Sequence, residues 1–346
     1  MKGLCYHGAR DIRCDTLPDP TIKDPGDILV RMIGCSICGS DLHIYRGHGW
    51  SPEPCYSVGH EAIGEVMEVG RAVRRHRPGD QVMISAAVGC GLCAPCLAGD
   101  INRCRTFDHM HVYGIGDGLE GIQSEAFVIP SGDSNAMKIP EGISHDQALM
   151  MTDMLPTAWL GAKNADIAPG DTVVVIGLGP IGLIAIEAAF AMGAAQVIAV
   201  GRSPDRLAIA QEMGARTVYP DDAVEMVGET TRGVMASSVI EAVGAQETVR
   251  QSIDLVRRTG TVSMVGVNLD PAFPFPMDLV LTRNITFRGA LCSTPQYWDE
   301  MIPFVREGRI RPERLITHRV SLSEGGEAYR ISADRQEGVL KTVMTP

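Results

Sequence analysis

The sequence predicts an α/β protein, with a doubly wound parallel sheet in one domain and a twisted, partly barrel-like β domain before it. Three observations lead to this fold class. The chain has 346 residues, enough for two domains of ordinary size. Its 38 glycines punctuate alternating apolar runs and turns, as in α/β proteins rather than helical bundles. Near residue 170, short β segments give way to β-branched runs that alternate with helical segments.

Short strands separated by glycine and proline are expected in the first domain, residues 1–154. Residues 26–34 and 59–70 are predicted strands, and PGD at 78–80 is a predicted turn before the strand QVMIS. Residues 90–104 contain four cysteines and little apolar periodicity, so a lobe or loop is expected there.

A parallel sheet with helical crossovers is expected at residues 155–290. The β-branched run TVVVIG (172–177) is typical of a strand buried on both faces. Further strands are predicted at 196–201, 216–219, 237–244, 260–266 and 284–291, and helices near 180–192, 204–213 and 246–257. These six strands with their crossovers predict the doubly wound fold. The tail, 291–346, contains a predicted helix and ends in the strand GVLKTVMTP, which we expect to return to the first domain.

An excess of acidic residues limits the classes of partner. The chain has 42 Asp and Glu against 31 Lys and Arg, a formal net charge of −11. Nucleic acid and anionic membrane surfaces are therefore not expected partners, whereas a small-molecule substrate is. The first residues lack the apolar core of a signal peptide, and no apolar run reaches the length of a membrane span, so a cytoplasmic location is expected. In that reducing compartment the ten cysteines are expected to be thiols or metal ligands.

The cysteine lobe has the spacing of a structural zinc site. The motif C-x2-C-x2-C-x7-C consists of Cys90, Cys93, Cys96 and Cys104. Four thiolates fill the tetrahedral coordination of Zn²⁺ and leave no open position for chemistry. Disulfides and an iron–sulfur cluster are the alternatives. A zinc module that reads nucleic acid is disfavoured because the flanking residues are not basic.

A second zinc site could form around Cys38 and His60, each of which lies beside a glycine. A catalytic zinc needs three protein ligands and an open fourth position. Taken alone, Cys38, His43 and His60 could equally be ordinary core or loop residues. Cys35 and Cys38 form a C-x2-C pair, but no second pair completes it. Asp153 lies in the apolar stretch ALMMTDMLPTAW, where it either caps a helix that starts near 154 or serves a nearby group that needs a carboxylate.

A dinucleotide site is predicted where a β-branched strand meets an apolar helix. The motif G-L-G-P-I-G there contains Gly177, Gly179, Pro180, Ile181 and Gly182. Glycines at these positions permit a tight turn and a close approach of pyrophosphate to the helix N-terminus. The alternative is a glycine-rich turn that binds no ligand.

The next strand favours NADP(H) over NAD(H). NAD-binding members of this fold usually end that strand with an acidic residue, which binds the ribose 2′-hydroxyl. Here Gly201 holds that place, and Arg202 and Ser203 follow. A missing carboxylate removes repulsion against a 2′-phosphate, and an arginine can pair with it. The alternative is that Arg202 is a solvated loop cation and either cofactor is used.

These motifs together resemble those of the zinc-containing medium-chain alcohol dehydrogenase family. The resemblance rests on C-G-S-D-L-H at 38–43, G-H-E at 59–61, the cysteine lobe at 90–104 and G-L-G-P-I-G at 177–182. It implies a GroES-like first domain, a Rossmann second domain, and hydride transfer between an alcohol and NADP in a cleft between the two. It also implies two zinc ions per chain and a homodimer or homotetramer. Alternatives are a polyol, threonine or formaldehyde dehydrogenase of the same family, or a non-catalytic zinc- or dinucleotide-binding protein.

The resemblance implies that Cys38 and His60 bind the catalytic zinc. The third ligand is commonly a cysteine, but this chain has none between 105 and 291. Some bacterial branches, including secondary-alcohol and formaldehyde dehydrogenases, place an aspartate in a segment that resembles MTDMLPT, and Asp153 matches that position. Zn²⁺ with Cys⁻, neutral His and Asp⁻ sums to zero charge, as it does with two cysteines and one histidine. Thr152 is then the expected helix cap.

Further roles follow from the resemblance. Ser40 and His43 match a relay that carries the alcohol proton to solvent. Glu61 is expected beside the zinc as a neighbour or a transient ligand, because a fourth protein ligand would make the site negative. Lys341 matches a position that holds a cofactor phosphate. Candidate walls of the substrate pocket, each equally a core or rim residue, are Trp50, His109, Trp159 and Leu291.

Overall fold

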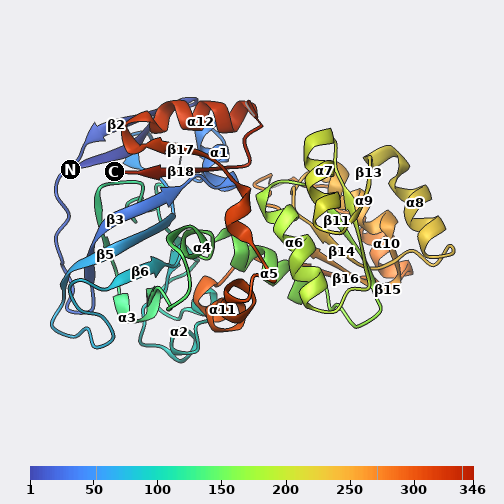
Figure 1. Ribbon diagram of the computed structural model, residues 1–346, viewed down its shortest axis with the longest axis horizontal. Coiled ribbons are helices and arrows are strands. Elements are labelled where there is room, and N and C mark those ends of the chain that lie inside the picture. The colour runs from blue at the N-terminus through green and yellow to red at the C-terminus, as the bar shows by residue number, and fades with distance from the viewer. Residues whose placement is uncertain (52, 271, 337) are drawn as a thin grey trace. The chain divides into compact units, whose positions relative to one another are not determined.

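The computed structural model describes residues 1–51, 53–270, 272–336 and 338–346. The chain divides into two compact units, one formed by residues 1–156 with 293–346 and the other by residues 157–292. Figure 1 shows both units, with many of their elements labelled. None of the helices in the described residues combines the length and apolarity that a membrane span requires.

The first unit is built mainly of β-strands. Its strands are β1 (Lys2–Gly8), β2 (Asp11–Thr16), β3 (Ile28–Ser36), β4 (Tyr56–Ser57), β5 (Glu61–Val69), β6 (Gln81–Ile84), β7 (Ala87–Val88), β8 (His111–Val112), β9 (Ala126–Ile129), β10 (Ala136–Lys138), β17 (Ile316–Ser321) and β18 (Lys341–Thr345). Its helices are α1 (Gly39–Tyr45), α2 (Ala94–Leu97), α3 (Gly132–Asn135), α4 (His145–Met150), α11 (Trp298–Arg306) and α12 (Gly325–Asp334), with 3-10 turns η1 (Ile101–Arg103), η3 (Thr294–Tyr297), η4 (Pro312–Leu315) and η5 (Leu322–Glu324). Helix α5 (Met154–Asn164) spans the boundary to the second unit.

One large sheet organises this unit. Within the described residues its strand order is β10-β6-β5-β3-β18-β17, and β9 also pairs with β3. All neighbours are antiparallel except β17 and β18, which run parallel. Strand β18 thus lies between β17, the strand before it in the chain, and β3, which is far from it in sequence (Figure 1).

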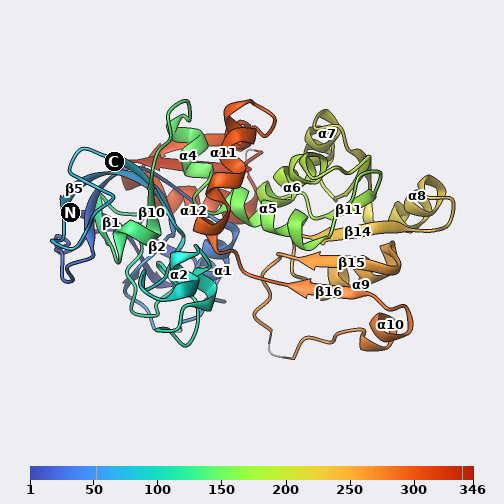
Figure 2. The same cartoon turned by 90° about the horizontal axis from the view of Figure 1, so that it is seen from below.

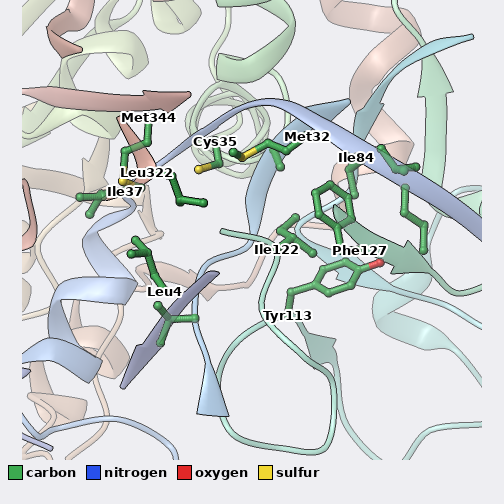
Figure 3. Close-up of a cluster of buried hydrophobic side chains, with 14 of the residues drawn as sticks. Leu4, Met32, Cys35, Ile37, Ile84, Tyr113, Ile122, Phe127, Leu322 and Met344 are labelled. Atoms are coloured by element: carbon green, nitrogen blue, oxygen red, sulfur yellow. The ribbon is translucent and has the colours of Figure 1, made fainter. Parts of the chain in front are cut away.

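The core of the first unit lies on one face of this sheet. Burial alternates along the first part of β3, as expected of a strand with one face inside. Figure 3 shows Met32 and Cys35 of β3 in one cluster with Ile84 of β6, Phe127 of β9 and Met344 of β18. All five are buried. The predicted twisted β domain is therefore confirmed.

The second unit contains a parallel sheet. Its strands are β11 (Thr172–Ile176), β12 (Gln196–Val200), β13 (Arg216–Val218), β14 (Ala236–Glu241), β15 (Val256–Met264) and β16 (Thr286–Gly289). Its helices are α6 (Pro180–Ala191), α7 (Pro204–Glu212), α8 (Ala223–Thr230), α9 (Gln246–Leu255) and α10 (Met277–Thr282), with a 3-10 turn η2 (Pro220–Asp222). Figure 2 shows helices to either side of the sheet.

The strand order confirms the predicted doubly wound fold. It is β13-β12-β11-β14-β15-β16 within the described residues, and every neighbouring pair is parallel. Four of the five residues of β11 are fully buried, because helices cover both faces of such a sheet. The order reverses beside β11, so the turn that leaves β11 opens at the topological switch point, where ligands of this fold bind.

Some elements differ from those predicted. Helices α8 and α10 are not predicted from the sequence, because glycine and proline residues in and near them are typical of turns. Strand β15 begins at Val256, four residues before the predicted start. Thr152 does not cap α5: its hydroxyl donates to the carbonyl of Leu149 at 2.7 Å, at the end of α4, and no bond from it to the described first turn of α5 is present. A threonine hydroxyl that reaches back in this way satisfies a carbonyl instead of a helix N–H.

Candidate active site

Three separate segments bring Cys38, His60 and Asp153 together. Cys38 lies between β3 and α1, and its backbone N–H donates to Asp41 Oδ2 at 2.9 Å, which fixes the start of α1. His60 immediately precedes β5, and Asp153 lies in the short turn between α4 and α5. The thiol sulfur, an imidazole nitrogen and a carboxylate oxygen of these residues all lie within 4.8 Å of one another.

Contacts in this group converge on one carboxylate oxygen. Cys38 Sγ donates to Asp153 Oδ2 at 3.2 Å, and His60 Nε2 lies 3.5 Å from the same oxygen. Cys38 and His60 are buried, and Asp153 is partly buried. Sulfur, nitrogen and oxygen donors in this combination suit Zn²⁺, and three ligands leave the fourth tetrahedral position open.

The pKa shifts of Cys38, His60 and Asp153 indicate that this group of side chains favours a bound positive charge. Burial raises the pKa of the Cys38 thiol, and the charges of Asp153 and Glu61 raise it further. Burial opposes ionisation of Asp153, but its contacts with His60 outweigh this and lower the pKa of Asp153 to about 2. Burial likewise opposes protonation of His60, yet Asp41 and Asp153 raise its pKa well above the usual range. A divalent cation bound here would displace the proton of His60 and ionise Cys38, so the donor set fits a metal.

Asp41 is a functional candidate that the sequence analysis did not single out. Its side chain is fully buried, and Oδ1 lies 3.2 Å from His60 Nδ1. Neither atom forms a hydrogen bond of good geometry within the described residues. A carboxylate at this nitrogen holds the imidazole so that Nε2 faces the metal position. The available signal was the acidic residue inside C-G-S-D-L-H, three residues after Cys38.

Glu61 and Lys341 form a buried ion pair between residues 280 positions apart. The Lys341 ammonium and the Ser36 hydroxyl both donate to Glu61 Oε2. Burial alone would lower the pKa of Lys341, but the charge of Glu61 outweighs it and raises the pKa. The charge of Lys341 thus lies beside Glu61, and its expected role toward a cofactor phosphate stays a prediction.

Helix α1 positions Ser40 and His43 on one face, because they are three residues apart. The Ser40 hydroxyl lies 3.2 Å from His60 Nε2, at the side of the imidazole that faces Asp153. His43 is half-buried, and burial, together with the nearby Arg46 and His48, lowers its pKa. A neutral imidazole at this place can accept a proton at neutral pH.

The four cysteines of the lobe also converge. Their sulfur atoms all lie within 4.8 Å of one another, with Cys93 Sγ 3.4 Å from Cys96 Sγ. The backbone N–H groups of Cys90 and Thr106 donate to Cys104 Sγ at 3.4 and 3.5 Å, as expected of an ionised thiolate. All ten cysteines are described, and none of them forms a disulfide. The lobe could hold one metal ion on four sulfurs.

The turn between β11 and α6 has the form predicted for a pyrophosphate site. Gly177 has φ +92°, a left-handed conformation that other residues rarely adopt. A Cβ on Gly182 would meet the carbonyl oxygen of Gly177 at 1.8 Å, so the helix packs directly on the turn. Gly179 precedes α6, with Pro180 and Ile181 in its first turn, and no side chain caps the helix within the described residues. Its first N–H groups are therefore open to an anion.

Arg202 lies at the carboxyl end of β12 with its guanidinium available. It is exposed, and no described residue forms a hydrogen bond or ion pair with it. Ser203 precedes α7. Gly201 is buried, and a Cβ there would meet Leu178 Cδ1 at 2.6 Å and Cγ at 2.9 Å. Packing against Leu178 is thus a second reason, not visible in the sequence, for a residue without a side chain at 201.

Comparison with known proteins accounts for both units. The family model for an alcohol dehydrogenase GroES-like domain matches residues 24–141, and the model for a zinc-binding dehydrogenase matches residues 180–307. A probable zinc-binding alcohol dehydrogenase of Mycobacterium tuberculosis is 39% identical over 346 residues, covering 100% of this chain and 89% of that protein. The chain belongs to the zinc-type alcohol dehydrogenase family. The resemblance carried by its motifs, to the zinc-containing medium-chain dehydrogenases, is confirmed.

Solved structures of zinc-type dehydrogenases share the fold over the full chain. The alcohol dehydrogenase TADH from Thermus sp. ATN1 superposes with a TM-score of 0.92 at 34% identity, covering 100% of this chain and 99% of that one. A proposed zinc-binding dehydrogenase from Sinorhizobium meliloti 1021, solved bound to NADP, gives a TM-score of 0.85 at 30% identity with the same coverage. The protein is therefore an oxidoreductase of this family with a nucleotide-binding fold.

Proposed function

We propose that the protein is a zinc- and NADP-dependent alcohol dehydrogenase that interconverts a primary or secondary alcohol and its aldehyde or ketone. One observation carries the proposal: the donor atoms of Cys38, His60 and Asp153 converge within 4.8 Å. Three protein ligands with an open fourth position are the arrangement of a catalytic zinc rather than a structural one. A second zinc on the cysteine lobe would have a structural role.

The residues around the zinc position set its charge. Cys38 and Asp153 supply two negative charges, which match those of one Zn²⁺, and His60 is neutral as a ligand. Glu61 adds no net charge, because Lys341 is paired with it. Such a site is neutral before substrate enters and accepts the oxygen of an ionising alcohol. When bound, the zinc supplies Lewis acidity that lowers the pKa of the alcohol hydroxyl.

Ser40 and His43 provide the path for the alcohol proton. Ser40 lies beside the metal position, 3.2 Å from His60 Nε2, where its hydroxyl can accept a proton from substrate oxygen and donate its own onward. His43 lies one helical turn further along α1 and is half-buried, at the border with solvent. Its lowered pKa keeps it neutral and able to receive that proton.

The cofactor would bind at the second unit. The open N-terminus of α6 suits the pyrophosphate, and the unpaired Arg202 suits a 2′-phosphate. The Sinorhizobium relative solved with NADP supports this choice. A homodimer or homotetramer stays the expected assembly.

Nicotinamide absorbance tests the proposal. A series of primary and secondary alcohols, and of aldehydes and ketones, is assayed with NADP(H) and with NAD(H). We expect a higher kcat/KM with NADP(H). In Arg202→Ala the KM for NADP should rise about 10–100-fold, because charge-assisted hydrogen bonds are worth about 1.5–3 kcal/mol, while the KM for NAD changes little.

The choice of variant and of control makes this test specific for Arg202. Replacing Gly201 by aspartate would also disturb Leu178, so the arginine variant alone is the cleaner probe. Arg250→Ala, which removes an exposed arginine paired with Asp254 on α9, is the matched control. Equal kcat/KM for both cofactors in the wild type, or equal losses with both in Arg202→Ala, would overturn the NADP assignment. Absence of turnover with every alcohol and carbonyl would overturn the dehydrogenase itself.

A further inference from the structure

We propose that His109, His111 and Asp117 form a third metal site, specific for divalent transition-metal ions and separate from the two zinc centres. One nitrogen from each imidazole and one oxygen of the carboxylate all lie within 4.8 Å of one another. The three residues belong to the segment that follows the cysteine lobe in the first unit. They are not among the residues proposed to bind the two zinc ions or the cofactor, or to carry the alcohol proton.

The His111 side chain is held from two directions. Its backbone belongs to β8, which pairs antiparallel with β7 and places His111 opposite Val88. The ring of Phe107 stacks on the His111 imidazole, with centroids 4.1 Å apart and planes 22° apart. The imidazole therefore has a fixed orientation before any ion binds, which reduces the entropy that binding must overcome.

The chain then turns so that Asp117 approaches His109. Gly114, Gly116 and Gly118 all have positive φ, and the Gly114 N–H donates to the Leu119 carbonyl at 3.1 Å, which closes the turn. The carboxylate of Asp117 contacts His109 Nε2. The His109 ring lies against that of His111, with centroids 5.1 Å apart. All three donors are thus assembled without rearrangement of the backbone.

The donor set selects the class of ion. Imidazole nitrogen suits zinc, copper, nickel and cobalt, whereas Mg²⁺ and Ca²⁺ prefer sites made of oxygen alone. His109 and Asp117 are 58% and 40% exposed, so water fills the remaining coordination positions and the ion exchanges with solvent. This distinguishes the site from the lobe, where four sulfurs enclose the metal.

An ion here would cross-link two ends of a segment that packs on both the lobe and the core of the first unit. Strand β8 contains only two residues, and beyond it Gly114 packs against the backbone of Gly59, next to His60. Met110 and Val112, on either side of His111, pack against the small apolar cluster of the lobe, which is Ala87, Cys96 and Ile101. A bound ion would therefore join the two ends of the 109–117 turn between the lobe and the segment before β5.

Calorimetric titration tests the site on the zinc-loaded protein, without substrate or cofactor. After dialysis against metal-free buffer, Zn²⁺ is added, and we expect one further ion to bind per chain. Changes even in the outer partners of metal ligands alter affinity by about 10–100-fold, so His111→Ala and Asp117→Asn should each weaken binding at least that much. His145→Ala, which removes another exposed imidazole, should bind like the wild type.

Cobalt identifies the donors. Co²⁺ added to the zinc-loaded protein should give ligand-field bands without a thiolate-to-metal charge-transfer band, since the site contains no sulfur. A charge-transfer band would show exchange into the cysteine sites and would overturn the proposal. So would the absence of a further ion, or equal weakening in His111→Ala and His145→Ala. These results do not depend on turnover, so they are separate from a failure of the proposed dehydrogenase.

Discussion

Asp153 lies among apolar residues at the place where the proposed catalytic zinc needs a third ligand. Met151 and Met154, close to it on either side in the sequence, are buried, and its carboxylate contacts both Cys38 and His60. Its pKa is about 2, because the contacts with His60 overcome the opposing effect of burial, so it is ionised throughout the physiological range. A residue in this state is better suited to a cation than to a neutral hydrogen-bond partner.

Removing this carboxylate should remove one metal and the reaction together. We expect Asp153→Ala to contain about one zinc per chain instead of two and to lose about 100-fold or more of kcat, because a catalytic zinc needs three protein ligands. Metal analysis by mass spectrometry and steady-state assays measure both. Asp153→Cys restores a ligand set of two cysteines and one histidine and should recover zinc. Wild-type zinc content and kcat in Asp153→Ala would exclude Asp153 as a ligand.

The ion pair of Glu61 and Lys341 should make a measurable contribution to the free energy of unfolding. Lys341→Met leaves a buried carboxylate without its cation, which typically costs about 3–5 kcal/mol, whereas the double variant with Glu61→Gln should recover most of this. Urea denaturation of both single variants and the double variant measures the coupling. Unchanged stability in Lys341→Met together with a raised KM for NADP would instead return Lys341 to the cofactor phosphate.

The turn between β11 and α6 contains two glycines with different structural roles, Gly179 and Gly182. A Cβ at Gly182 would collide with the Gly177 carbonyl, whereas one at Gly179 would meet nothing within 4 Å. Gly182 thus allows the helix to pack on the turn, and Gly179 leaves space above the helix N-terminus, where a pyrophosphate would lie.

Alanine at each position separates the two duties. Gly182→Ala should destabilise the second unit by about 1–3 kcal/mol or more, because a rigid backbone atom must move. Gly179→Ala should unfold like the wild type but bind NADP more weakly. Thermal unfolding and fluorescence titration with NADPH measure the two effects. Equal unfolding of both variants, or tight NADPH binding by Gly179→Ala, would contradict this division.

Elements with strong local signals could be predicted from the sequence, and contacts between distant residues could not. The β-branched run of β11 and the glycines after it predicted that strand to within one residue at its end. The cysteine spacing predicted the lobe. In contrast, Asp41 beside His60 and Lys341 beside Glu61 depend on where separate strands and loops meet. No periodicity or motif carries that information, and only the resemblance suggested that Asp153 joins Cys38 and His60.

At the scale of the whole molecule, each unit has its own core, and the lobe has almost none. The second unit buries a cluster that includes Val174, Ile198 and Val239, whereas the buried residues of the lobe cluster are Ala87, Cys96 and Ile101. So small an apolar cluster offsets little of the entropy of ordering a loop, and the proposed lobe metal would supply the difference.

Loss of the lobe metal should therefore loosen the lobe without unfolding the second unit. We expect Cys104→Ser to lose one zinc and to be cleaved faster by trypsin after the exposed Arg103 and Arg105. Mass spectrometry of the fragments measures this, and the second unit should stay intact. Cys55→Ser, at an exposed cysteine outside the metal groups, should behave like the wild type. Unchanged zinc content and resistance to trypsin in Cys104→Ser would contradict a structural metal.

The place of β18 between β3 and β17 has a consequence for synthesis on the ribosome. Residues 157–292 form the second unit from one continuous segment, so this unit can fold while translation is still in progress. The large sheet of the first unit cannot be completed until later, because β18, one of the neighbours of β3, is made more than 300 residues after it. Until Lys341 emerges, Glu61 has no cation beside it. The nascent protein thus acquires its nucleotide fold before the setting of its catalytic centre is complete.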